Sequence, residues 1–223
     1  MSAVQAVGKP RRDVAREAAG RESWWRLLYR DYRRYRVAGR SAAATVLLTQ
    51  GFWASAVYRA SRAFVAAAPQ GALQTAARAL AAAAQKLVEI LTGICLPREC
   101  EIGPGLYLPS FGGIILSHGP IGENCTIEHG VTLGMAGRGE ERGAPSIGDR
   151  VFIGAHSMIV GRISVGDDAV IFPGSIVTRS VPPRALVMGH PARVVSREGS
   201  FDWIAYDGMH SDPRRRAALE ASD

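Results

Sequence analysis

A spacing of six residues runs through the second half of the chain and constrains its fold more than any other feature. An aliphatic residue occupies every sixth position at Ile147, Ile153, Ile159, Val165, Ile171 and Val177. Neither the period of about 3.6 residues of an α-helix nor the alternation of a simple strand gives this spacing. A parallel β-helix does, because each short straight segment buries one apolar side chain and then turns a corner. The spacing therefore predicts a parallel β-helix of hexapeptide repeats.

The same spacing extends backwards in two shorter runs. These runs consist of Ile102, Leu108 and Ile114, and of Ile121, Ile127 and Leu133. One extra residue falls between them, and a longer insertion at 135–146, rich in glycine and charge, follows the second run. Such insertions lie on one edge of a β-helix, which is often its binding face. Three blocks per coil predict four coils, which begin at Ile102, Ile121, Ile147 and Val165.

The segment before the repeats has helical composition. Between residues 22 and 96, an apolar stripe with arginine on its other side is followed by alanine-rich stretches. We expect an α+β chain with a flexible segment at 1–20, an α-helical domain at 21–96, the β-helix at 97–195 and a tail at 196–223. Phe201 and Trp203 predict that the tail packs on the helical domain or on a cleft, whereas residues 212–223 are expected to be frayed.

Composition excludes several classes of function. The formal net charge is +7, but no nucleic-acid recognition motif accompanies it, and a solvated arginine face or attraction of a polyanionic cofactor explains it better. No apolar stretch is long enough to span a membrane, and the first residues are not a secretory signal, so we expect a cytoplasmic protein. The 3 cysteines lack metal-ligand spacing and are expected to be reduced, and no metal is predicted.

Several short motifs occur in a fixed order along the repeats. They are GPGL at 103–106, FGGII at 111–115, GVTLG at 130–134, RG at 142–143, PSIGD at 145–149, VPP at 181–183 and GHPAR at 189–193. With this combination, roughly residues 50–195 resemble the serine acetyltransferase family of hexapeptide-repeat acyltransferases. The resemblance implies a left-handed β-helix and a homotrimer with active sites between neighbouring subunits, with a dimer of trimers joined through the helical domain as the alternative. It also implies acetyl-CoA as the acyl donor, a small hydroxylated acceptor and a histidine general base.

The chain departs from the family where the family carries its base. By the resemblance, Ser110 occupies the position of the catalytic histidine, and Pro109 that of the aspartate before it. A second histidine position, at the end of the glycine-rich loop, is occupied by Ala144. A serine hydroxyl is too weak a base at neutral pH to replace an imidazole unaided. The base must therefore lie elsewhere, or catalysis is slow or absent.

His129 is the candidate for a relocated base. Ser110 lies two places after Leu108, and His129 lies two places after Ile127. Equivalent positions in successive coils stack about 4.8 Å apart, so His129 should lie one coil from Ser110 and face the same cleft. It would act directly, or through Ser110 as a proton relay or acylated nucleophile. A corner histidine without catalytic function, or another residue as base, are the alternatives.

Further residues are assigned to ligands by the resemblance and by their chemistry. Arg138 and Arg142 of the glycine-rich loop, with His118, are candidates for binding the acceptor. The candidates for binding acetyl-CoA are Gly134, Gly137, Ala155, Pro173, Arg179 and Arg193. Together these assignments imply an acetyl-CoA-dependent O-acetyltransferase, with L-serine as first acceptor and O-acetylserine for cysteine biosynthesis as product. The alternatives are a catalytically degenerate CoA-binding scaffold, and an acetyltransferase for a sugar or specialised metabolite.

Overall fold

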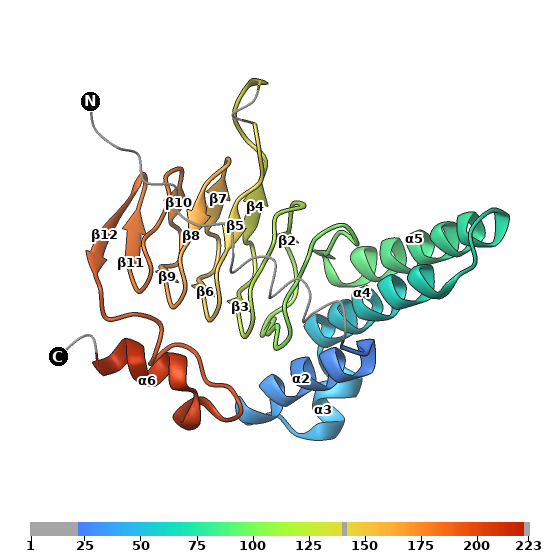
Figure 1. Cartoon of the computed structure of the whole chain (residues 1–223), viewed down its shortest axis with the longest axis horizontal. Helices are drawn as coiled ribbons and strands as arrows, with labels where there is room; N and C mark the ends of the chain where they lie inside the picture. The colour runs from blue at the N-terminus through green and yellow to red at the C-terminus, as the bar shows by residue number, and fades with distance from the viewer. Residues whose placement is uncertain (1–21, 140–141, 221–223) are drawn as a thin grey trace.

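A computed structural model of the chain describes residues 22–139 and 142–220. Helices lead into a parallel β-helix, and the C-terminal segment returns along its side (Figure 1). The helices are α2 (Trp24–Val37), α3 (Ala42–Leu48), α4 (Gln50–Ala67) and α5 (Ala72–Thr92), followed at the end of the chain by η2 (Met209–Ser211) and α6 (Pro213–Glu220). The expected flexible segment at 1–20 lies outside the described residues. No helix in the described ranges is long and apolar enough to cross a membrane.

The β-helix has three faces of stacked short strands. What we call the open face consists of β1 (Ile94–Cys95), β2 (Ile114–Ile115), β4 (Thr132–Gly134), β7 (Met158–Val160) and β10 (Ile176–Val177). The covered face consists of β3 (Thr126–Ile127), β6 (Phe152–Ile153), β9 (Val170–Ile171), β11 (Leu186–Gly189) and β12 (Ala192–Ser196). The polar face contains β5 (Ser146–Ile147) and β8 (Ser164–Val165). All strand pairs are parallel except β11 with β12.

The strand register confirms the four predicted coils. Ile102 pairs with Ile121 and Ile121 with Ile147 through isolated bridges, and Ile147 pairs with Val165 within the polar face. A further bridge from Val165 to Val181 begins one more turn. The repeat positions point inward, because a straight three-residue segment must bury its middle side chain to form a core. The side chains with no exposed surface include Leu108, Ile114, Ile127, Ile153, Ile159 and Ile171.

The register of the first coil differs from the sequence prediction at one corner. Ile115 pairs with Thr132, so Leu116, and not Ile114, lies level with Leu133. The extra residues therefore lie in the corner before β2, not only between Ile114 and Ile121. Gly112 and Gly113 have φ angles of 88° and 67° there, which permits a wider turn without disturbing the strands.

Buried charges join the helices to the first coil. The Asp31 carboxylate (0% exposed) accepts hydrogen bonds from the backbone N–H groups of Gly105 and Leu106, at 2.8 and 2.9 Å. It also accepts two hydrogen bonds from the guanidinium of Arg59, at 3.0 and 3.2 Å. Arg34 is only 3% exposed and donates to the Gly105 carbonyl at 2.9 Å. A fully solvated arginine face was therefore the wrong expectation for Arg34, whose charge is buried against the β-helix.

The C-terminal segment closes the covered face. The Trp203 ring lies 5.0 Å from Phe152 and 5.9 Å from Phe172, measured between centroids. Ile204 and Tyr206 are buried with Phe152 in a second apolar cluster. Packing on a face of the β-helix explains the aromatic content of the tail, which sequence reasoning assigned to the helical domain or a cleft.

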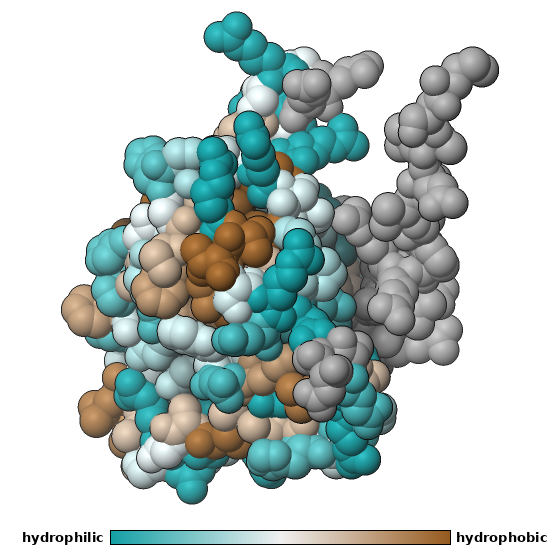
Figure 2. Space-filling view, turned by 90° about the vertical axis from the view of Figure 1, so that its left-hand side faces the viewer, coloured by the Kyte–Doolittle hydropathy of each residue, from teal (hydrophilic) through white to brown (hydrophobic). Residues whose placement is uncertain are grey.

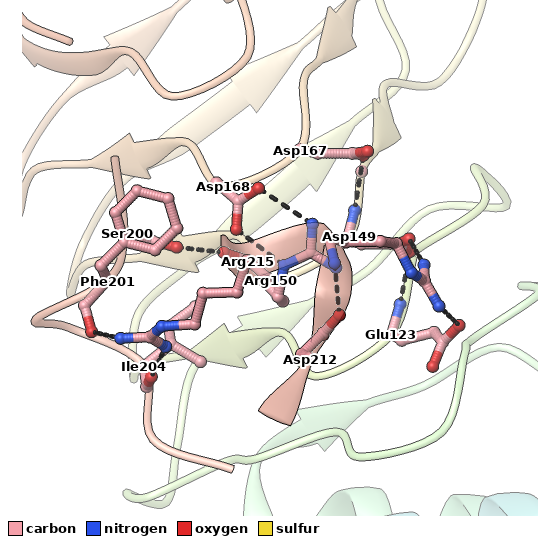
Figure 3. A network of polar contacts seen from close by, with 12 residues as sticks. Glu123, Asp149, Arg150, Asp167, Asp168, Ser200, Phe201, Ile204, Asp212 and Arg215 are labelled. Atoms are coloured by element: carbon pink, nitrogen blue, oxygen red, sulfur yellow. Dashed lines mark hydrogen bonds and ion pairs between the residues drawn. The ribbon is translucent and has the colours of Figure 1, made fainter. Parts of the chain in front are cut away.

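The predicted frayed end is wrong for residues 213–220, which form α6. Arg215 is buried and donates to the carbonyls of Phe201 and Ile204. Figure 3 shows this arginine among the charged groups that join the tail to the coil corners. Arg150 and Asp168 form a buried pair there, with N–O distances of 2.7 and 2.9 Å. Arg215 thus satisfies two backbone carbonyls of the tail and holds α6 against it.

Successive corners beside the covered face are capped by carboxylates. Asp149 accepts a hydrogen bond from the Glu123 N–H at 2.9 Å, and Asp167 accepts one from the Asp149 N–H at 3.0 Å. Burial raises the pKa of Asp149 above its ordinary value, and the Arg214 guanidinium lies 3.0 Å from its other oxygen. The stacked corners are therefore held by side chains as well as by the strand ladder.

Candidate functional site

A cleft of about 480 Å³ lies between the first helices and one edge of the β-helix. We call this the histidine edge, where the chain passes from the covered face to the open face at residues 109–113, 128–130, 155–156 and 173–174. The residues that line the cleft are Arg40, Leu48, Thr49, Gln50, Gly51, Pro109, Ser110, Phe111 and His129.

The β-helix register places Ser110 and His129 level with each other on neighbouring coils. Tyr107 bridges to Thr126, and the Ile127 N–H donates to the Tyr107 carbonyl at 3.0 Å. Counting onward along both strands aligns Ser110 with His129, and both residues line the cleft. Their placement one coil apart agrees with the expectation from the repeat spacing.

The imidazole of His129 is fixed by packing on its own edge. Its ring lies 4.8 Å from the His156 ring, measured between centroids, in an edge-to-face arrangement. The backbone N–H of His156 donates to the His129 carbonyl at 2.9 Å. Gly130, with φ of 70°, makes this approach possible, since a Cβ there would collide with His156. The His129 Nδ1 atom is buried and has no hydrogen-bond partner among the described residues.

The carboxylate next to His129 in sequence has a different partner. Glu128 accepts a hydrogen bond from the Ala155 backbone N–H at 2.8 Å, which ties two coils together. It therefore acts as a structural brace, and the described residues provide no carboxylate that orients the imidazole.

Arg40 is a cleft residue that sequence reasoning missed. It follows α2, which ends at Val37, and Gly39 just before it has a φ of 84° that turns the chain toward the β-helix. Its guanidinium donates to the Pro109 carbonyl at 3.1 Å and to Thr49 Oγ1 at 3.4 Å. Its sequence neighbours are also arginine-rich, so no local signal distinguished this arginine from solvent-facing ones.

The candidate acceptor-binding residues lie on another edge within the same chain. We call it the loop edge, where the open face meets the polar face at residues 117–120, 135–139, 142–145, 161–163 and 178–180. Arg138 and Arg142 are exposed there, on a loop closed by the bridge between Ala136 and Gly143. His118 is exposed and lies 3.8 Å from the Glu99 carboxylate. The structure thus separates these residues from Ser110 and His129 by the width of the open face.

The candidate cofactor residues are divided in the same way. Ala155 and Pro173 lie on the histidine edge, one coil apart. Gly137 and Arg179 lie at the loop edge, and Gly134 is the last residue of β4, next to that edge. Arg193 is exposed on β12, opposite Met188.

The end of the β-helix at β11 and β12 exposes apolar side chains, namely Met188, Val194 and Val195. Figure 2 views the molecule from this end and shows an apolar cluster among hydrophilic side chains.

Other titratable groups have separate structural roles. Burial raises the pKa values of the Cys100 and Cys125 thiols to about 12, so both remain protonated at neutral pH. All three cysteines are free, and Cys95 is partly exposed. Within residues 22–139 and 142–220, no group of three or more histidine, cysteine, aspartate or glutamate side chains is arranged to hold a metal ion.

Comparison with known proteins identifies the family. Residues 146–179 match the family described as "Hexapeptide repeat of succinyl-transferase". The chain is 37% identical over 158 residues to serine acetyltransferase of Mycobacterium tuberculosis, an alignment that covers 66% of this chain and 69% of that protein.

Solved structures give the same result. Soybean serine acetyltransferase complexed with serine superposes with a TM-score of 0.68 at 30% identity, over 80% of this chain and 72% of that one. A serine acetyltransferase in complex with CoA superposes with a TM-score of 0.67 at 26% identity, over 82% and 74%. The shared repeat, fold and sequence agree with the motif resemblance, and the chain belongs to the serine acetyltransferase family.

Proposed function

We propose that the protein transfers the acetyl group of acetyl-CoA to the hydroxyl of a small acceptor, with L-serine as the first acceptor. Family membership and the relatives solved with serine and with CoA support this proposal. The observation that carries it for this chain is the cleft that holds Ser110 and His129 together. Its product from serine, O-acetylserine, is a precursor for cysteine biosynthesis, and the free cysteines are consistent with a reducing, cytoplasmic setting.

His129 is the proposed general base. Its Nδ1 is buried, which leaves Nε2 as the ring nitrogen that meets an acceptor hydroxyl in the cleft. When the imidazole takes the hydroxyl proton, the acceptor oxygen bonds to the acetyl carbon and the carbon–sulfur bond of the thioester breaks. The proton then passes from the imidazolium to the CoA thiolate. Ser110 lies one coil away, where its hydroxyl positions the acceptor or relays the proton.

Completing the site requires a second copy of the chain, and we propose a homotrimer of left-handed β-helices. Ile115 (54% exposed) and Met158 (41% exposed) point outward from the open face, and Ile115 is level with Thr132 and Met158 in the strand ladder. This apolar face lies between the histidine edge and the loop edge. Packing it around a threefold axis would bring Arg138 and Arg142 of one copy to the cleft of the next.

The same arrangement accounts for the divided cofactor residues. Ala155 and Pro173 line up on the histidine edge with His129, whereas Gly134 and Gly137 lie across the open face. We propose that the pantetheine arm of acetyl-CoA runs in the groove between two copies. Arg179 and Arg193 are then available for its phosphates, because both are exposed.

One observation favours a second candidate function. No carboxylate among the described residues orients His129, and by the motif resemblance Pro109 and Ser110 stand where the family has its acid–base pair. A protein that binds CoA without transferring its acetyl group would have the same fold and cleft. The enzyme is preferred, because an imidazole one coil from Ser110 lines the cleft and can accept a proton.

The test is serine-dependent release of CoA from acetyl-CoA, with O-acetylserine identified by mass spectrometry and CoA binding measured by calorimetry. The proposed enzyme forms O-acetylserine in stoichiometric amounts with free CoA. CoA binding without turnover on serine or any other hydroxylated acceptor would establish the scaffold instead.

A further inference from the structure

The described lining of the cleft carries positive charge without a negative partner. Among the nine described residues that line it, Arg40 is the one permanently charged side chain, and none is an aspartate or glutamate. The remaining polar side chains are Thr49, Gln50, Ser110 and His129. Within this lining, the carboxylate of a free amino acid has an ionic partner in Arg40.

The guanidinium of Arg40 has hydrogen-bonding capacity to spare. It uses one donor on the Pro109 carbonyl and one on Thr49 Oγ1, whereas a guanidinium has five N–H donors. No carboxylate of the described residues lies within 4.0 Å of it, although Arg30, Arg33 and Arg59 all have such partners. An unpaired guanidinium beside a cleft is suited to a carboxylate, which it binds through two parallel hydrogen bonds.

Arg40 is also tied directly to the proposed reaction centre. Its partner Pro109 precedes Ser110, and its partner Thr49 precedes α4, so the guanidinium bridges the two walls of the cleft. A carboxylate held by Arg40 therefore lies in the same cleft as the imidazole of His129. A hydroxyl a few bonds from that carboxylate is then within the space where the base takes its proton.

We infer that Arg40 binds the carboxylate of the acceptor, so that the acceptors of this protein are short hydroxycarboxylates, L-serine among them. This inference rests on the proposed acetyl transfer and defines its acceptor class. The chemistry is unchanged: the thioester carbon–sulfur bond breaks, a carbon–oxygen bond forms at the acceptor hydroxyl, and the hydroxyl proton passes through His129 to the CoA thiolate. A neutral alcohol lacks the group that Arg40 recognises.

Three acceptors of matched size separate the two charged groups. L-serine carries both, 3-hydroxypropanoate carries only the carboxylate, and 2-amino-1,3-propanediol carries only the ammonium. We expect kcat/KM for L-serine and for 3-hydroxypropanoate to exceed that for the diol by at least roughly tenfold. A kcat/KM for the diol within about threefold of that for L-serine would overturn the inference, because it would show that the carboxylate is not recognised.

Variants of Arg40 separate recognition from a structural role. R40Q should raise KM for both carboxylates by roughly 10- to 100-fold and leave KM for the diol unchanged, since a charge-assisted hydrogen bond is lost. R40K should restore part of that loss. R33Q, which removes an exposed partner of Asp207 on the same helix, is the matched control and should change none of the constants. An equal effect of R40Q on all three acceptors would show that Arg40 only holds the cleft walls together.

Calorimetry in the presence of CoA measures acceptor binding without acetyl transfer, so it tests the inference independently of the proposed function. Binding of 3-hydroxypropanoate that is lost in R40Q supports the inference, even if no acetyl group is transferred and the proposed function fails. Turnover of L-serine without any dependence on Arg40 would overturn the inference alone.

Discussion

Removing the Asp31 carboxylate should destabilise the whole chain, because this group joins α2 and α4 to the first coil. It has no exposed surface and accepts hydrogen bonds from two backbone N–H groups and from Arg59, which is itself 4% exposed. Asp31→Ala leaves a buried guanidinium without its counter-charge and two N–H groups without acceptors. Breaking a buried ion pair in this way costs about 3–5 kcal/mol.

The assay is urea unfolding followed by circular dichroism at fixed protein concentration. A loss of about 4 kcal/mol, with a slope of about 2 kcal/mol per molar urea, lowers the midpoint by about 2 M. Asp207→Ala removes the carboxylate of an exposed pair with Arg33 and should leave the midpoint unchanged, because solvent screens that pair. A midpoint for Asp31→Ala within about 0.5 M of wild type would refute the assigned role of the buried pair.

Three further predictions concern the β-helix. Cys125 should resist iodoacetamide at pH 8 and react only in urea, because its thiol is buried and protonated. Burial of this thiol should also make stability depend on pH. Its contribution to stability is complete below the ordinary thiol pKa of 9.0 and should be lost as the pH rises toward the raised pKa of about 12. Gly130→Ala should lower turnover at least about tenfold with CoA binding intact, because its Cβ collides with His156 behind the candidate base; unchanged turnover would contradict this packing. Asp168→Ala should cost about 3–5 kcal/mol in urea unfolding, because Arg150 is buried and loses its partner; a loss below about 1 kcal/mol would argue against it.

The coil pattern was predictable because inward positions of a β-helix recur at fixed spacing. Ile147 and Val165 begin successive coils as the period indicates, and the register between Ser110 and His129 follows from the same count. The corner at Gly112 and Gly113 was not predictable, since extra residues in a turn leave the strands on both sides in register. Spacing therefore identifies strands more reliably than it identifies corners.

The charged contacts of the helical segment could not be read from the sequence. Arg34 and Arg40 lie in one arginine-rich stretch, yet one is buried against the Gly105 carbonyl and the other lines the cleft. Helical periodicity identifies which side chains share one face of a helix, but it does not show which groups of a distant coil those side chains contact. The division of the site residues between the histidine edge and the loop edge was also not predictable from the sequence, because it depends on how the coils fold around the open face.

The most direct test of the proposed catalytic centre is the acetyl transfer rate of His129→Ala at saturating acetyl-CoA and L-serine. His210→Ala is the control, because that histidine is exposed in η2, away from the cleft residues. Loss of a general base predicts a fall in kcat of roughly 100- to 10,000-fold, with CoA affinity unchanged and the control fully active. Wild-type turnover by His129→Ala would contradict the assignment and move the base to another group.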